Sequence, residues 1–509
     1  MASHSHEVAF FVGERLSQRA QQDPDKTALI FRGVATNFSQ VEQAVDNLAA
    51  HLTQEGVRAG DRVALLLPNC TEFALCYYAT QRLGAITVVF DARLKGRELE
   101  GVLKDANPCL LVTHASIRPE IADVLEKFND LQQWLVGGTD APTFDSRLTT
   151  AGAAKLDKPP LKPHDSALIL YTSGTTGEPK GAVLTHVNLA QFPIIMGTMH
   201  RTDASEVWGC LLPMSHVSGP IYCNEIIDKG SSMVIFDQLN PATLLEGIAH
   251  NRVTIFHGVP IHFQLLLSAR NRADFDLSAV RMAGLMGTTI PVSLMHAVKS
   301  LLPHAQVIQG YGLTETSPLI TLTEADRADQ KMASIGKAVP GIEINIVDDQ
   351  GHAALEGEII TRGPHVMKEY FGKPEATAER IRDGWLYTGD IGRCDDDGYY
   401  YHLGRKDDMI ITGGLNVYPA EVENTLCDHP SVREAAVFAM GDAGRGQAIG
   451  AAVVIQEGQS IADKELLAFL RKHLAAFKVP QRLKTVEALP RTATGKVRKE
   501  ELAQAAAGW

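Results

Sequence analysis

Residues Ser166–Gly181 read SALILYTSGTTGEPKG, a stretch that joins a short apolar run to a loop of glycine and hydroxyl residues. The run Ser166–Tyr171 has the length and composition of a buried strand. The loop offers backbone N–H and hydroxyl groups that can surround phosphate oxygens, with Lys180 as a nearby cation. The Walker A pattern cannot be fitted here. An ordinary surface loop is the alternative, but the strand directly before it favours a phosphate site.

Outward from this stretch, helical and strand patterns alternate along the chain. Leu244–Arg252 reads as a helix that leads into an apolar strand at Val253–Val259, and Leu294–Leu302 leads in the same way into a strand at Val307–Gly312. After the glycine-rich loop we expect a helix from about Asn188. Because strands that are apolar along their whole length are covered on both faces, this alternation predicts an α/β fold of parallel sheets flanked by helices.

The pattern changes after about Gly341, where GIEINIVDD, GEIITRG and GYYYHLGR are short strands separated by turn residues. They predict a small antiparallel or barrel-like region at 341–404. From 405 onward a strand, the helix Pro419–Leu426, two further strands and the helix LLAFLRKHL indicate a separate α+β unit. We therefore predict a large N-terminal body of parallel βα sheets that includes the barrel-like region (1–404). A small mobile α+β C-terminal domain (405–509) follows, with its hinge near Asp407.

Length, charge and cysteine usage exclude several classes of protein. The 509 residues suit several domains, and a formal net charge of -12 argues against a chain-wide nucleic-acid-binding surface. The 7 cysteines are irregularly spaced without a C-x-x-C pair, so we expect buried apolar side chains, a reducing compartment and no structural zinc. The N-terminus lacks the features of a secretory signal, and no apolar run approaches the ~20 residues that span a bilayer. We expect a soluble, cytoplasmic protein that binds no nucleic acid.

Further motifs follow the loop in chain order. Gln309–Thr316 reads QGYGLTET, Tyr387–Gly392 reads YTGDIG, Gly404–Glu423 reads GRKDDMIITGGLNVYPAEVE and Pro490–Lys496 reads PRTATGK. Together with the loop, their order and spacing resemble the adenylate-forming superfamily, which includes acyl-CoA synthetases, the adenylation domains of peptide synthetases and luciferases. The run GGLNVYPAEVE resembles the acyl-CoA synthetases most closely. The resemblance spans the chain from about Ala28 to the C-terminus, and it implies an AMP-forming acid–thiol ligase that uses ATP with Mg²⁺, a carboxylic acid and coenzyme A.

The resemblance implies two reaction steps. A carboxylate attacks the α-phosphate of ATP and expels pyrophosphate, and the thiol of coenzyme A then attacks the acyl-adenylate and releases AMP. Lys496 is expected to bridge the carboxylate and α-phosphate oxygens in the first step, where a cation offsets the charge that develops. The C-terminal domain would then rotate about Asp407, withdraw Lys496 and bring Gly413 and Gly414 to the pantetheine arm of coenzyme A.

The nucleotide contacts also come from the resemblance. Tyr311 is expected against adenine, Thr314 on the α-phosphate and Glu315 on Mg²⁺, for which a carboxylate is a suitable hard ligand. Asp390 is expected to accept hydrogen bonds from the ribose, and Arg405 to contact ribose or phosphate, whereas either residue in isolation would more often form a surface ion pair. The expected ATP-binding residues are Thr172, Ser173, Gly174, Thr175, Thr176, Gly177, Lys180, Gln309, Gly310, Tyr311, Gly312, Thr314, Asp390, Arg405 and Lys496, and the expected catalytic residues are Lys496, Thr175, His216 and Glu315.

The acyl-binding site is expected around Leu212–Tyr222, LPMSHVSGPIY, where His216 takes the position of a residue that gates the acyl site in the family. A structural histidine is the alternative interpretation. No Asp in this segment could pair with a substrate ammonium group, which disfavours an amino-acid substrate. The stretch GLMGTTIP at Gly284–Pro291 departs from the family, and Met286 either lines an adaptable apolar pocket or serves packing. The expected pocket residues are His216, Val217, Val259, Ile261, Gly284, Met286, Gly287 and Gly310.

These segments offer no Arg or Lys for a second substrate carboxylate, so we expect an apolar monocarboxylic acid, either a medium-chain fatty, an alicyclic or an aryl acid. The main alternative is a free-standing adenylating enzyme that loads an acyl carrier protein. A light-emitting relative also stays open. A non-catalytic binding protein would need to have lost a phosphate-binding or bridging residue, and those residues are present. The chain is compatible with a homodimer.

Overall fold

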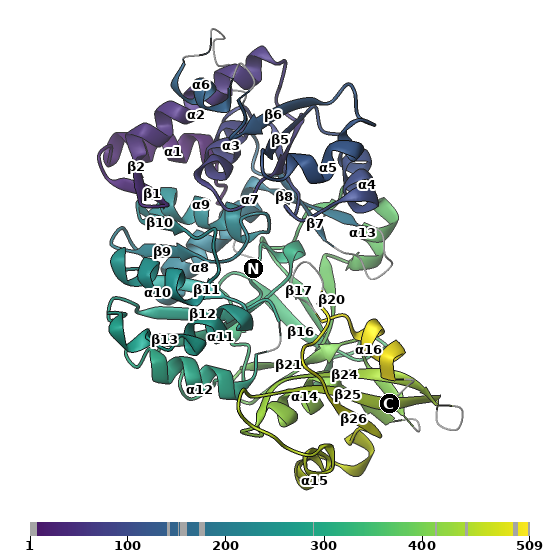
Figure 1. Cartoon of the computed structure of the whole chain (residues 1–509). Coiled ribbons are helices and arrows are strands. Elements are labelled where there is room, and N and C mark those ends of the chain that lie inside the picture. The colour runs from purple at the N-terminus through teal and green to yellow at the C-terminus, as the bar shows by residue number, and fades with distance from the viewer. Residues whose placement is uncertain are drawn as a thin grey trace.

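The computed structural model describes residues 8–139, 143–150, 152, 160–172, 179–288, 290–412, 415–442, 446–491, 497–506 and 509. Two large mixed sheets lie in the upper part of Figure 1, and the C-terminal strands (yellow-green) lie at the bottom. The α/β architecture with a smaller α+β unit at the C-terminus is the fold class that the sequence predicts.

One large sheet has the order β15-β14-β13-β12-β11-β9-β10-β1-β2. The strands from β1 to β13 in this order are parallel, and the edge strands β2, β14 and β15 pair antiparallel. Their bounds are β1 Thr27–Phe31, β2 Val34–Asn37, β9 Val207–Cys210, β10 Ser232–Ile235, β11 Ile255–Gly258, β12 Met282–Met286, β13 Gln306–Tyr311, β14 Thr321–Leu322 and β15 Lys337–Ala338.

The second large sheet has the order β18-β8-β7-β4-β3-β5-β6 and is parallel except at β8 and β18. Its strands are β3 Arg62–Leu66, β4 Ile86–Val89, β5 Leu110–His114, β6 Gln132–Val136, β7 Ser166–Thr172, β8 Lys180–Thr185 and β18 Glu369–Tyr370. The predicted buried strand at Ser166–Tyr171 is therefore confirmed as β7.

Two smaller sheets follow. The first is antiparallel and contains β16 Glu343–Val347, β17 Glu356–Arg362, β19 Ile381–Arg382, β20 Trp385–Cys394 and β21 Tyr400–Arg405, which confirms the predicted antiparallel region. The second contains β22 Ile410–Thr412, β23 Leu415–Val417, β24 Val432–Asp442, β25 Gly446–Ile455 and β26 Arg482–Thr485. It has an apolar core of its own that includes Ile410, Val437 and Leu466.

Helices cover the faces of the sheets (Figure 1). The capping box of Asn37 and Gln40 begins α2, and proline at the first turn begins α10, α11 and α14, where its fixed φ suits a helix start. The α-helices are α1 Val12–Gln22, α2 Phe38–Gln54, α3 Thr71–Arg82, α4 Gly96–Ala106, α5 Arg118–Leu125, α6 Phe144–Thr149, α7 His186–Leu189, α8 Gln191–His200, α9 Ser218–Lys229, α10 Pro241–His250, α11 Pro260–Ser268, α12 Val292–Leu301, α13 Pro374–Arg380, α14 Pro419–Cys427, α15 Asp463–His473 and α16 Lys499–Ala505. Short 3₁₀ turns are η1 Arg272–Asp274, η2 Thr314–Thr316 and η3 Ala476–Lys478.

The main apolar core lies between the two large sheets. It joins strand residues such as Ile255 and Leu168 from the two sheets with Phe73, Phe192 and Ile226 from α3, α8 and α9. Another core contains the outer side chains of β11–β13 and the inner faces of α10–α12. The parallel strands are thus covered on both faces, as their apolar sequences predict.

One expectation was incomplete and another was wrong in part. A helix begins close to Asn188 as expected, at His186 in α7, but the chain between the glycine-rich loop and this helix forms β8, which pairs antiparallel with β7. The loop therefore joins two strands of a hairpin and does not lead directly into a helix. Cys109 is exposed and Cys394 is partly exposed, whereas the other cysteines are buried as expected.

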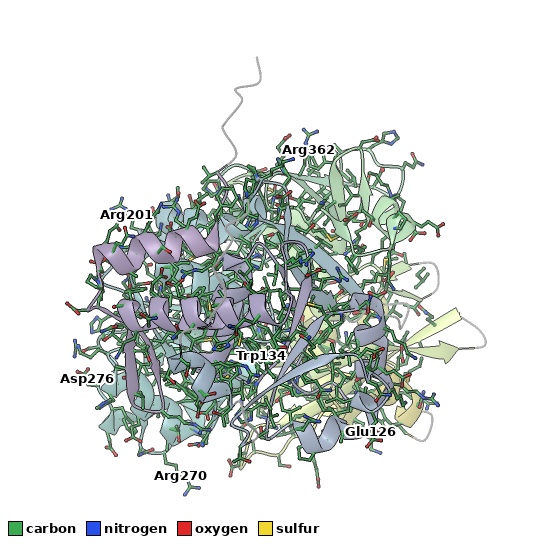
Figure 2. All side chains as sticks on the ribbon, turned by 90° about the horizontal axis from the view of Figure 1, so that it is seen from above. Glu126, Trp134, Arg201, Arg270, Asp276 and Arg362 are labelled. Carbon is green, nitrogen blue, oxygen red and sulfur yellow. The ribbon has the colours of Figure 1, made fainter. Side chains whose placement is uncertain are left out.

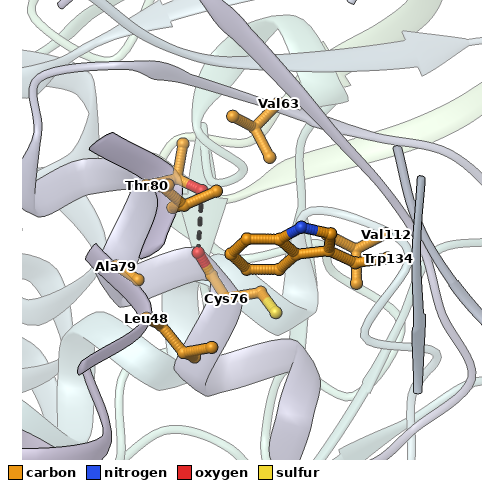
Figure 3. A pocket seen from close by; sticks show the side chains of 8 residues that line it. Leu48, Val63, Cys76, Ala79, Thr80, Val112 and Trp134 are labelled. Atoms are coloured by element: carbon orange, nitrogen blue, oxygen red, sulfur yellow. Dashed lines mark hydrogen bonds between the residues drawn. The ribbon is translucent and has the colours of Figure 1, made fainter. Parts of the chain in front are cut away.

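The outer surface carries charges of both signs. Figure 2 shows Arg201, Arg270, Asp276 and Arg362 at the outline of the molecule, whereas the buried Trp134 lies inside. Next to Trp134, a small gap lies between α2, α3 and the strands β3 and β5 (Figure 3). Its lining is largely apolar, and the Thr80 hydroxyl donates to the Cys76 carbonyl at 2.8 Å, so we interpret the gap as imperfect packing. Within the described residues, no helix combines the length and the apolarity needed to cross a bilayer.

Candidate active site

Three of the predicted nucleotide-binding side chains meet at one buried carboxylate. Asp390 on β20 faces Arg405 on β21 in the strand register, and the Arg405 Nη1 lies 3.2 Å from the Asp390 Oδ1. The hydroxyl of Tyr311, at the end of β13, donates to the Asp390 Oδ2 at 2.7 Å. Asp390 is only 2% exposed. Residues from three separate sequence motifs therefore form one cluster at the C-terminal end of a parallel strand, which is where ligands bind in open α/β sheets.

His402 completes this cluster and was not predicted. Its Nε2 lies 3.4 Å from the Asp390 Oδ1, and its ring lies 5.8 Å from the ring of Tyr311. Burial by itself raises the pKa of Asp390, but the neighbouring His402 and Arg405 side chains outweigh burial and hold this pKa below its ordinary value. Asp390 is thus an anionic acceptor in a nearly dry setting. His402 belongs to none of the site residues that the sequence motifs named, so only the pairing of β20 with β21 reveals it.

Glu315 lies in η2, is 7% exposed and is fixed by a second residue that the sequence did not single out. The hydroxyl of Tyr370 donates to the Glu315 Oε1 at 2.7 Å. Tyr370 lies on β18, which pairs with β8, and the Lys180 Nζ lies 5.5 Å from the centre of its ring. Tyr370 therefore connects Glu315 to the end of the glycine-rich loop.

The β7–β8 hairpin brings the two ends of the glycine-rich loop together. Thr172 and Lys180 are register partners in the β7–β8 hairpin, and the Thr172 hydroxyl lies 3.4 Å from the Lys180 carbonyl oxygen. Thr314 begins η2, next to Glu315, and is partly exposed. Asp407 is exposed on the segment between β21 and β22. The predicted site residues Ser173, Gly174, Thr175, Thr176, Gly177, Gly413, Gly414 and Lys496 lie outside the described residues.

Some of the remaining residues predicted to bind the nucleotide contact other parts of the chain in the structure. The side-chain amide of Gln309 donates to the Met332 carbonyl. A Cβ on Gly312 would lie 1.7 Å from the Pro318 carbonyl oxygen, so glycine is required there by the fold itself. Gln309 and Gly312 thus have structural reasons for their identity that do not depend on a ligand.

Glu315 is the carboxylate of this site that suits a metal ion. Within the described residues no group of three or more His, Cys, Asp or Glu side chains could hold a metal ion by itself. Glu315 has one oxygen engaged by Tyr370, and its Oε2 accepts no hydrogen bond from a described residue. A carboxylate oxygen that has no partner among the described residues fits a Mg²⁺ ion whose other ligands are phosphate and water oxygens.

On the acyl side, His216 lies directly before α9 and pairs with a residue from the other large sheet. Its Nε2 lies 3.6 Å from the Oδ2 of Asp91, which follows β4. Arg93 donates to both oxygens of Asp91, at 2.9 and 2.7 Å. Burial lowers the pKa of His216, and the Asp91 carboxylate opposes that effect. The side chain of His216 is still 36% exposed, which suits a group at the rim of a site. Val217 follows it in the chain and is partly buried.

The predicted acyl-pocket residues at the ends of β11–β13 contact one another. The Met286 Cε lies 3.1 Å from the position of a Cβ on Gly284 and 3.6 Å from one on Gly310. A Cβ on Gly287, whose φ of +87° favours glycine, would lie 3.2 Å from the Val259 Cγ1. The structure therefore brings these residues together. Ile261 on α11 is 45% exposed.

A buried histidine that the sequence did not reveal lies against the same glycine. His257 on β11 is the register partner of Gly284, and a Cβ on Gly284 would lie 2.4 Å from the His257 Cδ2. Glycine is needed at 284 because the imidazole ring occupies this space. The acyl-pocket residues predicted on this segment were Val259 and Ile261, and His257 was not among them.

The AMP-binding enzyme family matches residues 16–371, and the AMP-binding enzyme C-terminal domain matches residues 421–496. The chain is 34% identical to feruloyl-CoA synthase of an Amycolatopsis species, with 95% of this chain and 97% of that protein covered. It is 33% identical to a long-chain-fatty-acid–CoA ligase of Bacillus subtilis, with 96% and 93% covered. The crystal structure of the anthranilate CoA ligase AuaEII with anthranoyl-AMP superposes with a TM-score of 0.91 at 27% identity and covers 99% of both chains.

Proposed function

The chain belongs to the family of AMP-binding enzymes and is an AMP-forming carboxylate–CoA ligase, and from this premise we propose that its substrate is an apolar monocarboxylic acid. The carboxylate of the acid attacks the α-phosphate of ATP, and pyrophosphate leaves with the electron pair of the broken P–O bond. The sulfur of coenzyme A then attacks the acyl carbon, loses its proton, and AMP leaves with the electron pair of the acyl–phosphate C–O bond.

The observation that carries the nucleotide assignment is the buried Asp390 carboxylate, whose Oδ2 accepts the Tyr311 hydroxyl and whose Oδ1 accepts no hydrogen bond from a described residue. Tyr311, His402 and Arg405 hold it in one orientation, and its charge suits the two adjacent hydroxyls of a ribose. Preorganised polar groups of this kind lose little free energy to rearrangement when the ligand binds.

Glu315 is the residue proposed to hold Mg²⁺. The metal would offset phosphate charge during substitution at phosphorus. The part of this chain in that step is to place the carboxylate: Tyr370 fixes one oxygen of Glu315, and the Met367 N–H donates to the Glu315 carbonyl at 2.8 Å. The Lys180 Nζ lies 5.5 Å from the centre of the Tyr370 ring, at the point where the glycine-rich loop rejoins β8.

The apolar character of the acid is supported by the predicted pocket residues at the ends of β11–β13. Met286 and Val259 contribute apolar side chains, and the glycines at 284, 287 and 310 add no polar group. The named relatives activate an aryl-substituted acid in one case and a long-chain fatty acid in another, so the family allows both kinds of apolar acid.

The test is pyrophosphate release over a panel of carboxylic acids, with and without coenzyme A. We expect turnover with an apolar monocarboxylic acid, the appearance of AMP and an acyl-CoA product only when coenzyme A is present. Turnover that ignores coenzyme A, or that needs a carrier protein as acceptor, would contradict the ligase assignment. A preference for dicarboxylic or amino acids would contradict the substrate class.

A matched pair of variants tests whether Glu315 takes part in the reaction. Glu315→Gln should lower pyrophosphate release by about tenfold or more, because a neutral amide is a poor ligand for a metal ion. Glu324 also accepts a hydrogen bond from a tyrosine, Tyr399, at 2.7 Å, but it lies outside the site. Glu324→Gln should therefore keep the activity of the unaltered enzyme. Equal losses in the two variants would mean that Glu315 serves stability alone.

A further inference from the structure

The imidazole of His257 is enclosed by aromatic rings in the core between the two large sheets. Its ring centre lies 5.4 Å from that of Trp208 on β9, 5.8 Å from that of Tyr222 on α9 and 6.3 Å from that of Phe192 on α8. The Trp208 and Phe192 rings stand nearly perpendicular to the imidazole, at 80° and 82°. His257 is 1% exposed, and all three surrounding rings are as deeply buried.

The polar atoms of this cluster have no partner within the described part of the chain. Neither ring nitrogen of His257, nor the Trp208 Nε1, nor the Tyr222 hydroxyl makes a hydrogen bond to any described residue. A buried polar group without a partner destabilises a protein by about 1–3 kcal/mol, and such groups are rare. Four of these atoms in one aromatic cluster therefore point to a polar partner from outside the described residues.

The cluster adjoins the proposed acyl pocket. His257 is the register partner of Gly284, and its ring fills the space that a side chain at 284 would need. The methyl group of Met286, two residues further along β12, lies over the same glycine. Met286 is partly exposed at the C-terminal end of its strand, where ligands enter such sheets, and its unbranched side chain can adopt other rotamers. Another rotamer of Met286 would uncover Gly284 and the edge of the His257 ring beside it.

Building on the proposed ligase function, we propose that His257 is a specificity-determining residue of the acyl pocket. The acid that it selects is an aromatic one whose ring carries a neutral hydrogen-bonding substituent, a hydroxyl or an amino group, at the end away from the carboxylate. The rings of Trp208, Tyr222 and Phe192 offer edge-to-face contacts to the substrate ring. The imidazole, the indole N–H and the tyrosine hydroxyl offer partners to the substituent.

The charge of His257 further restricts which ring substituents the cluster can bind. Burial lowers the pKa of His257 to about 3, so its ring is neutral near pH 7 and presents one N–H donor and one acceptor. A neutral imidazole in an apolar enclosure suits a hydroxyl or an amine and gives a second carboxylate no compensating charge. A plain alkyl chain would leave all four polar atoms unpaired.

The experiment compares matched pairs of acids that differ only in the ring substituent, such as cinnamate with 4-hydroxycinnamate and phenylacetate with 4-hydroxyphenylacetate, and includes octanoate. The readout is kcat/KM for CoA-dependent pyrophosphate release. We expect the unaltered enzyme to favour at least one substituted acid over its parent by about tenfold or more, the value of one buried hydrogen bond. His257→Phe keeps a ring of similar size without nitrogens, and it should reduce that ratio to near one while the unsubstituted acid is still used.

Each outcome separates the two proposals. If octanoate or an unsubstituted aryl acid is turned over but no pair is discriminated, the ligase function stands and the proposal for His257 is wrong, with water as the partner of the cluster. If His257→Phe keeps the ratio, His257 is not the selector. The ratio of the unaltered enzyme is informative even if the variant does not fold. Absence of CoA-dependent turnover with every acid would instead overturn the function on which the inference rests.

Discussion

Replacing Asp390 with asparagine is the sharpest perturbation that the structure offers. Asparagine keeps the size of the side chain and one acceptor oxygen, and it removes the charge that faces Arg405 at 3.2 Å. If Asp390 binds the ribose, the two hydroxyls of ATP lose a charged acceptor. If Asp390 only holds the strands together, the change affects stability and leaves nucleotide selectivity as it was.

The size of both effects follows from the geometry. A hydrogen bond to a charged group contributes about 1.5–3 kcal/mol, so removing the ribose 2′-hydroxyl should lower the kcat/KM of the unaltered enzyme by about tenfold to about a hundredfold. In Asp390→Asn this discrimination between ATP and 2′-deoxy-ATP should fall to about twofold or threefold. The free energy of unfolding should drop by about 1–3 kcal/mol, because the Tyr311 hydroxyl and Arg405 lose a charged partner in a setting where Asp390 is 2% exposed.

The stability effect has a defined pH dependence. The pKa of folded Asp390 is held below its ordinary value of 3.8, so its stabilisation is fully present above that pH and is lost as the pH falls below it. The difference in unfolding free energy between the two proteins should therefore be constant near neutral pH and shrink in acid. Thermal melting over a series of pH values measures it.

A matched control lies a few residues away in the chain. Asp395 also accepts a tyrosine hydroxyl, that of Tyr401 at 2.9 Å, and also pairs with a cation, Lys331 at 2.9 Å. Asp395→Asn should lower stability slightly and leave the preference for ATP over 2′-deoxy-ATP intact. An unchanged preference in Asp390→Asn, or an equal loss in both variants, would refute the ribose assignment.

Three further predictions address other parts of the chain. Lys496→Ala should nearly abolish adenylate formation, while a supplied acyl-adenylate still reacts with coenzyme A, and an equal loss of both steps would contradict the predicted rotation. Tyr370→Phe should raise the Mg²⁺ concentration needed for half-maximal pyrophosphate release, because Glu315 loses its hydroxyl donor; an unchanged requirement would exclude this role. Burial raises the pKa of Glu225 to about 8, so its contribution to stability is full below 4.5 and is lost as the pH rises through 8. The melting temperature of Glu225→Gln should therefore fall less than that of the unaltered protein between about pH 5 and about pH 8, and parallel curves would refute the shift.

Much of the fold could be predicted because its strands are short apolar runs bounded by turns. The β-strand at Ser166 and the helix–strand pairs ending at β11 and β13 were readable in this way. β8 was not, because the run KGAVLT after the loop is as compatible with a helix start as with a strand. Two pairings fix it as a strand: the hairpin with β7, and the pairing with β18, which lies far away in the chain.

The candidate site divides in a similar way. Tyr311, Asp390 and Arg405 lie in recognisable motifs, and the structure brings them together, although their roles stay predictions until they are tested. His402 and His257 belong to no motif. His402 matters because it lies beside Asp390, and His257 because it lies beside Gly284 on the neighbouring strand. Sequence spacing carries no information about neighbours on another strand.

The predicted hinge at Asp407 lies directly after the last residue that the antiparallel sheet holds in place. The Lys406 N–H donates to the Gly389 carbonyl at 2.8 Å, and the Lys406 ammonium lies 3.3 Å from Glu358, so both residue 406 and its neighbour Arg405 are fixed to the antiparallel sheet. Asp407 is exposed, and β22 begins at Ile410 in a different sheet. A rotation of the C-terminal residues can therefore be absorbed by the backbone at Asp407 without breaking the Asp390–Arg405 contact. We propose that the ribose site stays intact through both reaction steps, while the residues beyond Asp407 exchange the group that faces the α-phosphate.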